Sequence, residues 1–222
     1  MGRIFDYDNA FFRMMGKLVD VFFVSLLWLT FSIPIVTIGA STQALYYTVH
    51  KQIKGGRGYV WQEFFSSFKD HWKANILLTL IFEVLITVLG YERLLLRTMA
   101  ENGGGDNLRI MYFVLVFFQF LIGAWAIFTF CYRARFIMDW KNSLKNGLLL
   151  MLGYLPRALL VMVTLAVAMF LIYLLPILIC IVPCLLFLLY EVLLEKVFLA
   201  IMKPEDVEQE EQLSMEQKRD HE

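Results

Sequence analysis

The stretch "ALLVMVTLAVAMFLIYLLPILICIVPCLLFLLY", residues 158–190, decides the class of fold because no charged side chain occurs in it. A helix needs about 20 apolar residues to cross a hydrocarbon core of about 30 Å. At about 1.5 Å per residue, one straight helix over this stretch would be roughly 50 Å long, too long for one tilted crossing. We therefore predict two crossings, with Pro176 in "LLPIL" at the turn and Pro183 as a second candidate helix breaker.

The rest of the chain has the same apolar character. Of 222 residues, 59% are hydrophobic and 18% are charged, which lies outside ordinary usage in soluble domains. A large soluble helical core is disfavoured because residues 110–132 offer almost no polar face. We predict an all-α polytopic membrane protein occupying residues 1–202, with about five transmembrane helices, at roughly 19–38, 75–97, 110–132, 157–174 and 177–196.

Basic residues collect in two of the predicted connecting loops. They are Lys51, Lys54, Arg57, Lys69 and Lys73 in the first of these loops, and Arg133, Arg135, Lys141, Lys145 and Arg157 in the second. Short loops rich in Lys and Arg are usually cytoplasmic, so we predict an N-terminus outside and a C-terminus in the cytoplasm of a bacterial cell. Arg3, Arg13 and Lys17 oppose this orientation. The acidic tail, residues 203–222, is predicted to be disordered, with a docking peptide as the alternative.

A proline lies near the end of the first predicted span, and several small residues follow that span. Pro34 removes a backbone N–H and breaks the helix, and nearby hydroxyl groups can satisfy the freed carbonyl groups. Gly39, Ala40 and Ser41 are small enough to let another helix approach closely. This segment is therefore predicted to be a helix break followed by a site of close packing.

Both basic loops are predicted to carry amphipathic interfacial helices. In the first loop, Leu45, Val49 and Ile53 recur every four residues and indicate one helix on the cytoplasmic surface. A second apolar stripe with spacings of four, three and four predicts another interfacial helix and consists of Trp61, Phe65, Phe68 and Trp72.

Glu83 is the candidate polar residue inside a predicted span. A carboxylate about ten residues into the second span is costly unless it is paired, protonated or facing water. Gln119, in the third span, could be its hydrogen-bond partner. Two interpretations remain open: a protonated Glu83 joins helices, or it contacts a ligand or partner.

No catalytic arrangement is visible in the sequence. No nucleophile–base–acid set and no metal-ligand spacing occurs among its cysteines and histidines, which are Cys131, Cys180, Cys184, His50, His71 and His221. We therefore predict no enzyme activity, no metal site, no cofactor and no nucleic-acid partner, and a lipid bilayer as the surroundings.

The N-terminal stretch "FDYDNAFFRMMGKLVDVFFVSLLWLTFSIPIVTIGASTQALYYTV" and the later "FFSSFKDHWKAN" resemble the YesL family of bacterial membrane proteins. The similarity extends through nearly the whole chain. It is most specific at Asn9, Phe12, Gly16, Pro34, Gly39 and residues 40–42. That family has no assigned activity, so the resemblance implies no catalytic residues.

Members of that family are commonly encoded beside carbohydrate ABC importers and polysaccharide-degrading enzymes in Gram-positive bacteria, and the resemblance implies an association with sugar uptake. Three hypotheses follow: an accessory or assembly subunit that contacts an importer's permease or ATPase, an independent small-solute transporter that uses Glu83, and a membrane-bound enzyme. The chain has no G-x-x-x-x-G-K-[ST] motif and no acidic-Ala-Ala-x-x-x-Gly coupling pattern in its basic loops. The accessory subunit is favoured because it needs neither.

Overall fold

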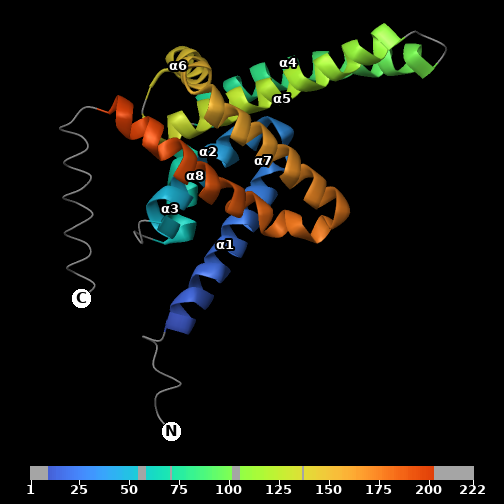
Figure 1. The fold of residues 1–222 in the computed structure, drawn as a ribbon. Coiled ribbons are helices and arrows are strands. Elements are labelled where there is room, and N and C mark those ends of the chain that lie inside the picture. The colour runs from blue at the N-terminus through green and yellow to red at the C-terminus, as the bar shows by residue number, and fades with distance from the viewer. Residues whose placement is uncertain (1–9, 55–58, 71, 102–105, 137, 203–222) are drawn as a thin grey trace, which may run out of the picture.

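The computed structural model describes residues 10–54, 59–70, 72–101, 106–136 and 138–202, and within these ranges the ordered elements are helical. This confirms the all-α class. The α-helices are α1 (Ala10–Ser32), α2 (Ile38–Thr48), α3 (Val60–Asp70), α4 (Trp72–Glu101), α5 (Asp106–Arg135), α6 (Trp140–Gly153), α7 (Leu155–Leu174) and α8 (Val182–Ile201), all shown in Figure 1. Three short segments complete the order: the 3-10 helices η1 (Ile35–Thr37) and η3 (Pro176–Cys180) and the π-helix η2 (Val49–Lys54).

Four helical segments are long and apolar enough to cross a bilayer: Met15–Ser32, Trp72–Glu101, Asn107–Arg135 and Leu155–Leu174. They coincide with four of the five predicted spans, so the chain is a multi-pass helical membrane protein by length and hydropathy. The fifth predicted span, 177–196, falls on η3 and α8. Helix α8 is not among the four because it contains Glu191, Glu195 and Lys196.

The uncharged run at 158–190 is divided near its first proline. Helix α7 ends at Leu174, Pro176 begins η3, and Pro183 lies in the first turn of α8. A proline in the first turn of a helix loses no helical hydrogen bond, because the N–H groups of that turn have no intrahelical partner. The two halves of the run therefore fold back as a helical hairpin.

Helix α1 ends earlier than the predicted boundary at residue 38. It stops at Ser32, and Pro34 precedes η1 in an extended conformation. The Thr37 hydroxyl, at 2.6 Å from the Phe31 carbonyl oxygen and 2.7 Å from that of Pro34, satisfies carbonyl groups at the break. The chain then reverses, and α2 runs back beside α1, with the Trp28 indole donating to the Thr42 hydroxyl at 3.2 Å.

Helix α2 lies at the centre of the molecule, in contact with α1, α3, α4, α5 and α8. This differs from the surface helix expected between 45 and 53. Leu45, Val49 and Ile53 do face the core, but Gln43 and Tyr46 on other faces are buried as well. An apolar stripe predicts one buried face, and it does not exclude burial of the others.

The long helices α4 and α5 pack against each other as a hairpin that extends away from the remaining helices in Figure 1. The short helices α3 and α6 precede α4 and α7, and each buries one face. In α6 that face consists of Ser143, Gly147 and Met151, at spacings of four residues. The base of the α4–α5 hairpin, α2 and α8 together enclose the buried polar residues described next.

Candidate functional site: a buried charge cluster

Four ionisable side chains from three elements meet inside the helices, and we call them the charge cluster: His50 of η2, Arg135 of α5, and Glu191 and Glu195 of α8. The two glutamates lie four residues apart, which places them on the same face of α8. Glu191 is fully buried and Glu195 is 9% exposed. A single helix therefore supplies two buried carboxyl groups to one site.

The carboxyl groups are held by the two basic residues. His50 Nδ1 lies 3.2 Å from Glu191 Oε1 and 3.8 Å from Glu195 Oε2. The Arg135 guanidinium donates through Nη2 to Glu195 Oε1 at 2.6 Å. Burying an ion costs several kcal/mol unless a partner compensates for the lost hydration. The contacts with His50 and Arg135 therefore offset the cost of burying Glu191 and Glu195. The same contacts join η2, α5 and α8.

Tyr46 completes the surroundings of the charge cluster. Its side chain is fully buried, and its hydroxyl group has no hydrogen-bond partner among the described residues. Burial raises the pKa of Tyr46 well above its usual value. Cys131, Glu195 and Glu191 raise this pKa further and Arg135 opposes them, which places the phenol beside the charge cluster.

The π-helical geometry of η2 is unusual, because π-helices are rare and occur frequently at functional sites. Beside His50 in this segment, Gln52 Nε2 donates to Asp20 Oδ2 of α1 at 3.0 Å. Lys51 Nζ lies 2.7 Å from Glu63 Oε2 of α3. Consecutive side chains of η2 thus reach α8, α3 and α1, so η2 links the charge cluster to three helices.

The ammonium group of Lys51 has two hydrogen-bond partners, Glu63 and the Tyr47 hydroxyl at 3.2 Å. Partial burial lowers the pKa of Lys51, but the bonds to Glu63 and Tyr47 outweigh it, and the pKa is raised overall. Lys51 therefore remains charged and holds α3 against η2.

A second buried cation lies near the end of α5. Arg133 is 5% exposed and donates to Asn75 Oδ1 of α4, the Met138 carbonyl oxygen and Ser143 Oγ of α6, at 2.8, 2.9 and 3.0 Å. All three partners are neutral. Through them the guanidinium connects α5 to α4 and α6. We therefore assign Arg133 a structural role in the packing of these helices.

Glu83 lies on α4 and Gln119 lies on the facing helix α5. The structure shows no hydrogen bond between these two side chains. Glu83 Oε1 is buried and has no partner among the described residues. The Gln119 amide nitrogen lies against Gly90, 3.9 Å from the position that a Cβ atom would take there. Gly90 is about two helical turns beyond Glu83, so Gln119 lies further along the hairpin.

The other predicted packing positions lie around α2. The Gly39 N–H donates to Thr79 Oγ1 at 3.1 Å, and a Cβ atom at Gly39 would overlap Phe130 and Thr79. Ala40 and Ser41 are fully buried beside it. Here α2 packs closely against α4 and α5.

The predicted aromatic stripe is divided between two helices, because Trp61, Phe65 and Phe68 lie in α3 and Trp72 is the first residue of α4. Its phenylalanines pack on α1. The Phe31 ring lies 5.0 Å from Phe65 and 5.1 Å from Phe68 between centroids. Trp61 and Trp72 are about half exposed. The two tryptophans are therefore partly exposed at the ends of the stripe, although the Trp61 ring also lies 4.3 Å from Phe65 and 6.1 Å from Phe23 of α1 between centroids.

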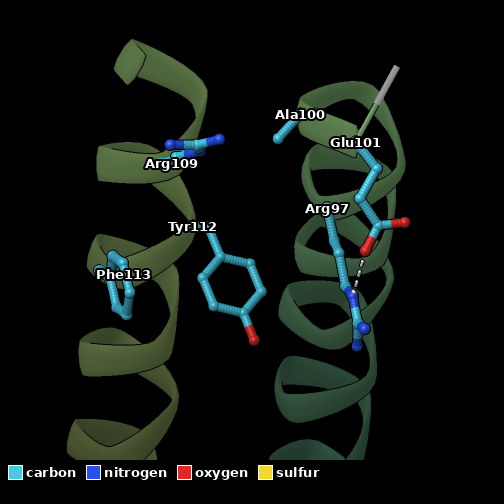
Figure 2. A pocket seen from close by; sticks show the side chains of 6 residues that line it. All are labelled: Arg97, Ala100, Glu101, Arg109, Tyr112 and Phe113. Carbon is cyan, nitrogen blue, oxygen red and sulfur yellow. Dashed lines mark hydrogen bonds and ion pairs between the residues drawn. The ribbon is translucent and has the colours of Figure 1, made fainter. Parts of the chain in front are cut away.

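A hollow of about 350 Å³ lies at the far end of the α4–α5 hairpin (Figure 2). It is lined by Arg97, Ala100, Glu101, Arg109, Tyr112 and Phe113. Tyr112 projects from α5 toward α4, and Arg97 Nε donates to Glu101 Oε1 at 2.9 Å. Both members of this ion pair are well exposed, so the hollow is an open surface feature.

Glu191 and Glu195 were missed by the sequence analysis. Both follow directly after the uncharged run, inside the predicted span 177–196, and their spacing of four residues was a usable signal. His50, 141 residues from Glu191, could not be paired with them from spacing. The site is assembled by tertiary structure.

The fold and the buried site define a multi-pass helical membrane protein whose charged groups are enclosed by helices. A family model described as "Protein of unknown function, DUF624" matches residues 21–93, which include most of α1, α2, η2 and α3 and much of α4. Of the charge cluster, the matched region contains His50. No curated protein and no solved structure matches the chain.

Proposed function

We propose that this protein is an accessory or assembly subunit of a carbohydrate importer of the ABC class in a bacterial cell membrane. The resemblance of its sequence to the YesL family supports this, because members of that family are commonly encoded beside such importers. The match of residues 21–93 to a family of unknown function is compatible with it. The partner would be a permease or ATPase subunit, and the protein itself would carry out no reaction.

The α4–α5 hairpin is the structural observation that carries the proposal. Each helix has 30 residues, about 45 Å at 1.5 Å per residue, against a hydrocarbon core of about 30 Å. Beyond their contact with each other, both helices expose large apolar side chains, among them Val84, Val88, Tyr91, Leu94, Ile110, Phe113, Val114 and Phe117. A projecting apolar hairpin of this length offers a surface on which the helices of another membrane protein can pack.

The test is isolation of the complex from its native membrane. The full chain, with an affinity tag on its C-terminal tail, is solubilised gently, and co-purifying proteins are identified and quantified by mass spectrometry. Stoichiometric importer subunits support the proposal. A lone protein or a homo-oligomer contradicts it.

Two substitutions locate the contact. In Phe113→Ala/Phe117→Ala, apolar volume is lost on the exposed face of α5, and we expect the importer subunits to be lost from the purified material. The matched control is Phe170→Ala on α7, which removes an equally exposed phenylalanine from a helix outside the hairpin. If Phe113→Ala/Phe117→Ala and Phe170→Ala retain the importer subunits equally well, the contact lies outside this face of α5.

An independent small-solute transporter is the second candidate function, and Glu83 is the observation that favours it. A buried carboxyl oxygen without a hydrogen-bond partner, inside a span, is a candidate for contact with a transported solute or proton. In a transporter, Glu83→Gln removes solute uptake while the protein remains folded. Unchanged uptake and growth in Glu83→Gln, together with normal folding of Glu83→Leu, would remove this residue from any transport pathway.

A further inference from the structure

The charge cluster has the composition of a metal site. His50, Glu191 and Glu195 each offer one ligand atom, and these atoms lie within 4.8 Å of one another. Imidazole nitrogen and carboxylate oxygen together suit first-row divalent metal ions such as Zn²⁺ and Mn²⁺. We propose that the charge cluster binds one divalent transition-metal ion through His50, Glu191 and Glu195.

The distances between the ligand atoms support this proposal. Metal–ligand bonds of about 2.0–2.2 Å place neighbouring ligand atoms roughly 3–3.5 Å apart in tetrahedral or octahedral geometry. His50 Nδ1 is 3.2 Å from Glu191 Oε1 and 3.8 Å from Glu195 Oε2. A change of a few tenths of an ångström in side-chain position would bring the two separations that involve His50 into that range. The ligand atoms of the two glutamates, which lie within 4.8 Å of each other, would also move closer together on binding.

Arg135 orients one of the ligands. Its guanidinium holds Glu195 Oε1 at 2.6 Å, and this bond directs Oε2 toward His50. Glu195 Oε2 is buried without a hydrogen-bond partner of its own. Outer partners that fix a ligating carboxylate in this way are typical of protein metal sites.

Tyr46 provides an independent observation. Its side chain is fully buried beside Glu191 and Glu195, and its hydroxyl group has no partner among the described residues. Buried polar groups are nearly always hydrogen-bonded in folded proteins. A water molecule in the open coordination position of the metal would supply the partner that this hydroxyl lacks.

His50 is the most exposed of the three proposed ligands. Its side chain is 25% exposed, whereas that of Glu191 is fully buried. The sequence analysis predicted no metal site because it searched for local spacing, and these ligands come from η2 and α8.

The competing explanation is an ion-pair network that only joins three helical elements. In that case His50 pairs with the glutamates and no ion is taken up. The two explanations differ in whether the purified protein binds metal stoichiometrically.

The experiment uses the full chain, purified in detergent without a polyhistidine tag and treated with a chelator. Mn²⁺ is titrated and followed by electron paramagnetic resonance, and Zn²⁺ is added as a competitor. We expect one Mn²⁺ per chain, displaced by Zn²⁺, with hyperfine coupling to the nitrogen of one imidazole. Glu191→Gln and Glu195→Gln should each weaken Mn²⁺ binding by at least ~100-fold, and His50→Gln should remove the nitrogen coupling.

The matched control is Glu63→Gln, which removes a carboxylate from the neighbouring ion pair with Lys51 and should leave metal binding unchanged. Because the Glu191 and Glu195 variants could fail to fold, Tyr46→Phe provides a milder test, with an expected loss of ~10-fold in affinity. The absence of stoichiometric binding up to millimolar Mn²⁺ or Zn²⁺ would overturn the proposal. Binding without nitrogen coupling, or binding unchanged in His50→Gln and Tyr46→Phe, would overturn it equally.

Discussion

Arg133 of α5 donates through Nε to the side-chain oxygen of Asn75 of α4, at 2.8 Å, in a region from which solvent is almost wholly excluded. The same guanidinium also reaches the Met138 carbonyl oxygen and the Ser143 hydroxyl. One cation therefore connects α4, α5 and α6 where the hairpin joins the remaining helices. Its three hydrogen-bond partners are neutral, and the Asp139 carboxylate interacts with it electrostatically.

This arrangement predicts the effect of Asn75→Ala. The substitution removes one hydrogen bond to a buried cation, and bonds to charged groups contribute about 1.5–3 kcal/mol. We expect the free energy of unfolding to fall by about 2 kcal/mol, which chemical denaturation in detergent would measure. Arg97→Gln is the control, because its ion pair with Glu101 is exposed and its loss should have no measurable effect. Equal free energies of unfolding for Asn75→Ala and Arg97→Gln would contradict the structural role of Arg133.

A second prediction concerns the approach of α2 to α4 and α5. In Gly39→Ala the new methyl group meets Phe130 and Thr79, and overpacking of this kind costs about 1–3 kcal/mol. We expect a lower unfolding temperature in detergent. Gly90→Ala is the matched control within α4, because the nearest atom is 3.9 Å from the added methyl group and alanine favours helix more than glycine does. An unchanged or raised unfolding temperature for Gly39→Ala would show that the helices can separate there without cost.

The sequence predicted the position of α7 well and the end of α1 poorly, for physical reasons that differ between the two helices. Residues 157–174 were predicted as a span and α7 covers Leu155–Leu174, because an uncharged run in lipid has to satisfy its backbone within the helix. The end of α1 was placed six residues late, at 38 instead of 32, because apolarity alone does not mark a helix end. Pro34 was the signal, since the residue before a proline is disfavoured in helical conformation.

The central position of α2 and the charge cluster were beyond the sequence analysis for a different reason. Periodicity along one helix indicates its apolar face, whereas burial of Gln43 and Tyr46 depends on which helices surround α2. Likewise, the pairing of His50 with Glu191 depends on how α8 folds back onto η2. Both features arise from long-range packing, so no local pattern reports them.

Tyr46 carries a prediction about alkaline stability. In an unfolded chain a tyrosine ionises near pH 10, whereas burial keeps the Tyr46 phenol protonated well above that pH. The unfolded state then releases a proton that the folded state retains, so this contribution to stability is complete below about pH 10 and is lost as the pH rises further. The loss is about 1.4 kcal/mol per pH unit until the folded phenol ionises.

The measurement is alkaline unfolding of the metal-free protein, followed by circular dichroism and by tyrosinate absorbance. Tyr46→Phe has no phenol to ionise, and its unfolding midpoint should move to higher pH. Tyr173→Phe is the control, because Tyr173 is 83% exposed and the substitution removes no hydroxyl group from the protein interior. A midpoint shared by wild type and Tyr46→Phe would mean that Tyr46 ionises without unfolding the protein.

The position of α3 relative to the membrane leads to the last prediction. Trp61 of α3 and Trp72, the first residue of α4, are about half exposed, and tryptophan favours the interface between lipid and water. In a chain whose native cysteines are replaced by serine, Trp61→Cys and Trp72→Cys should react with a membrane-impermeant maleimide. If the basic loops are cytoplasmic, this reaction occurs in inside-out vesicles and not in intact cells. Phe117→Cys, on the apolar face of the hairpin, is the control that should remain unlabelled in both. Labelling of Trp61→Cys and Trp72→Cys in intact cells would reverse the predicted orientation. Labelling of these two positions only after detergent is added would place α3 and the start of α4 within the bilayer.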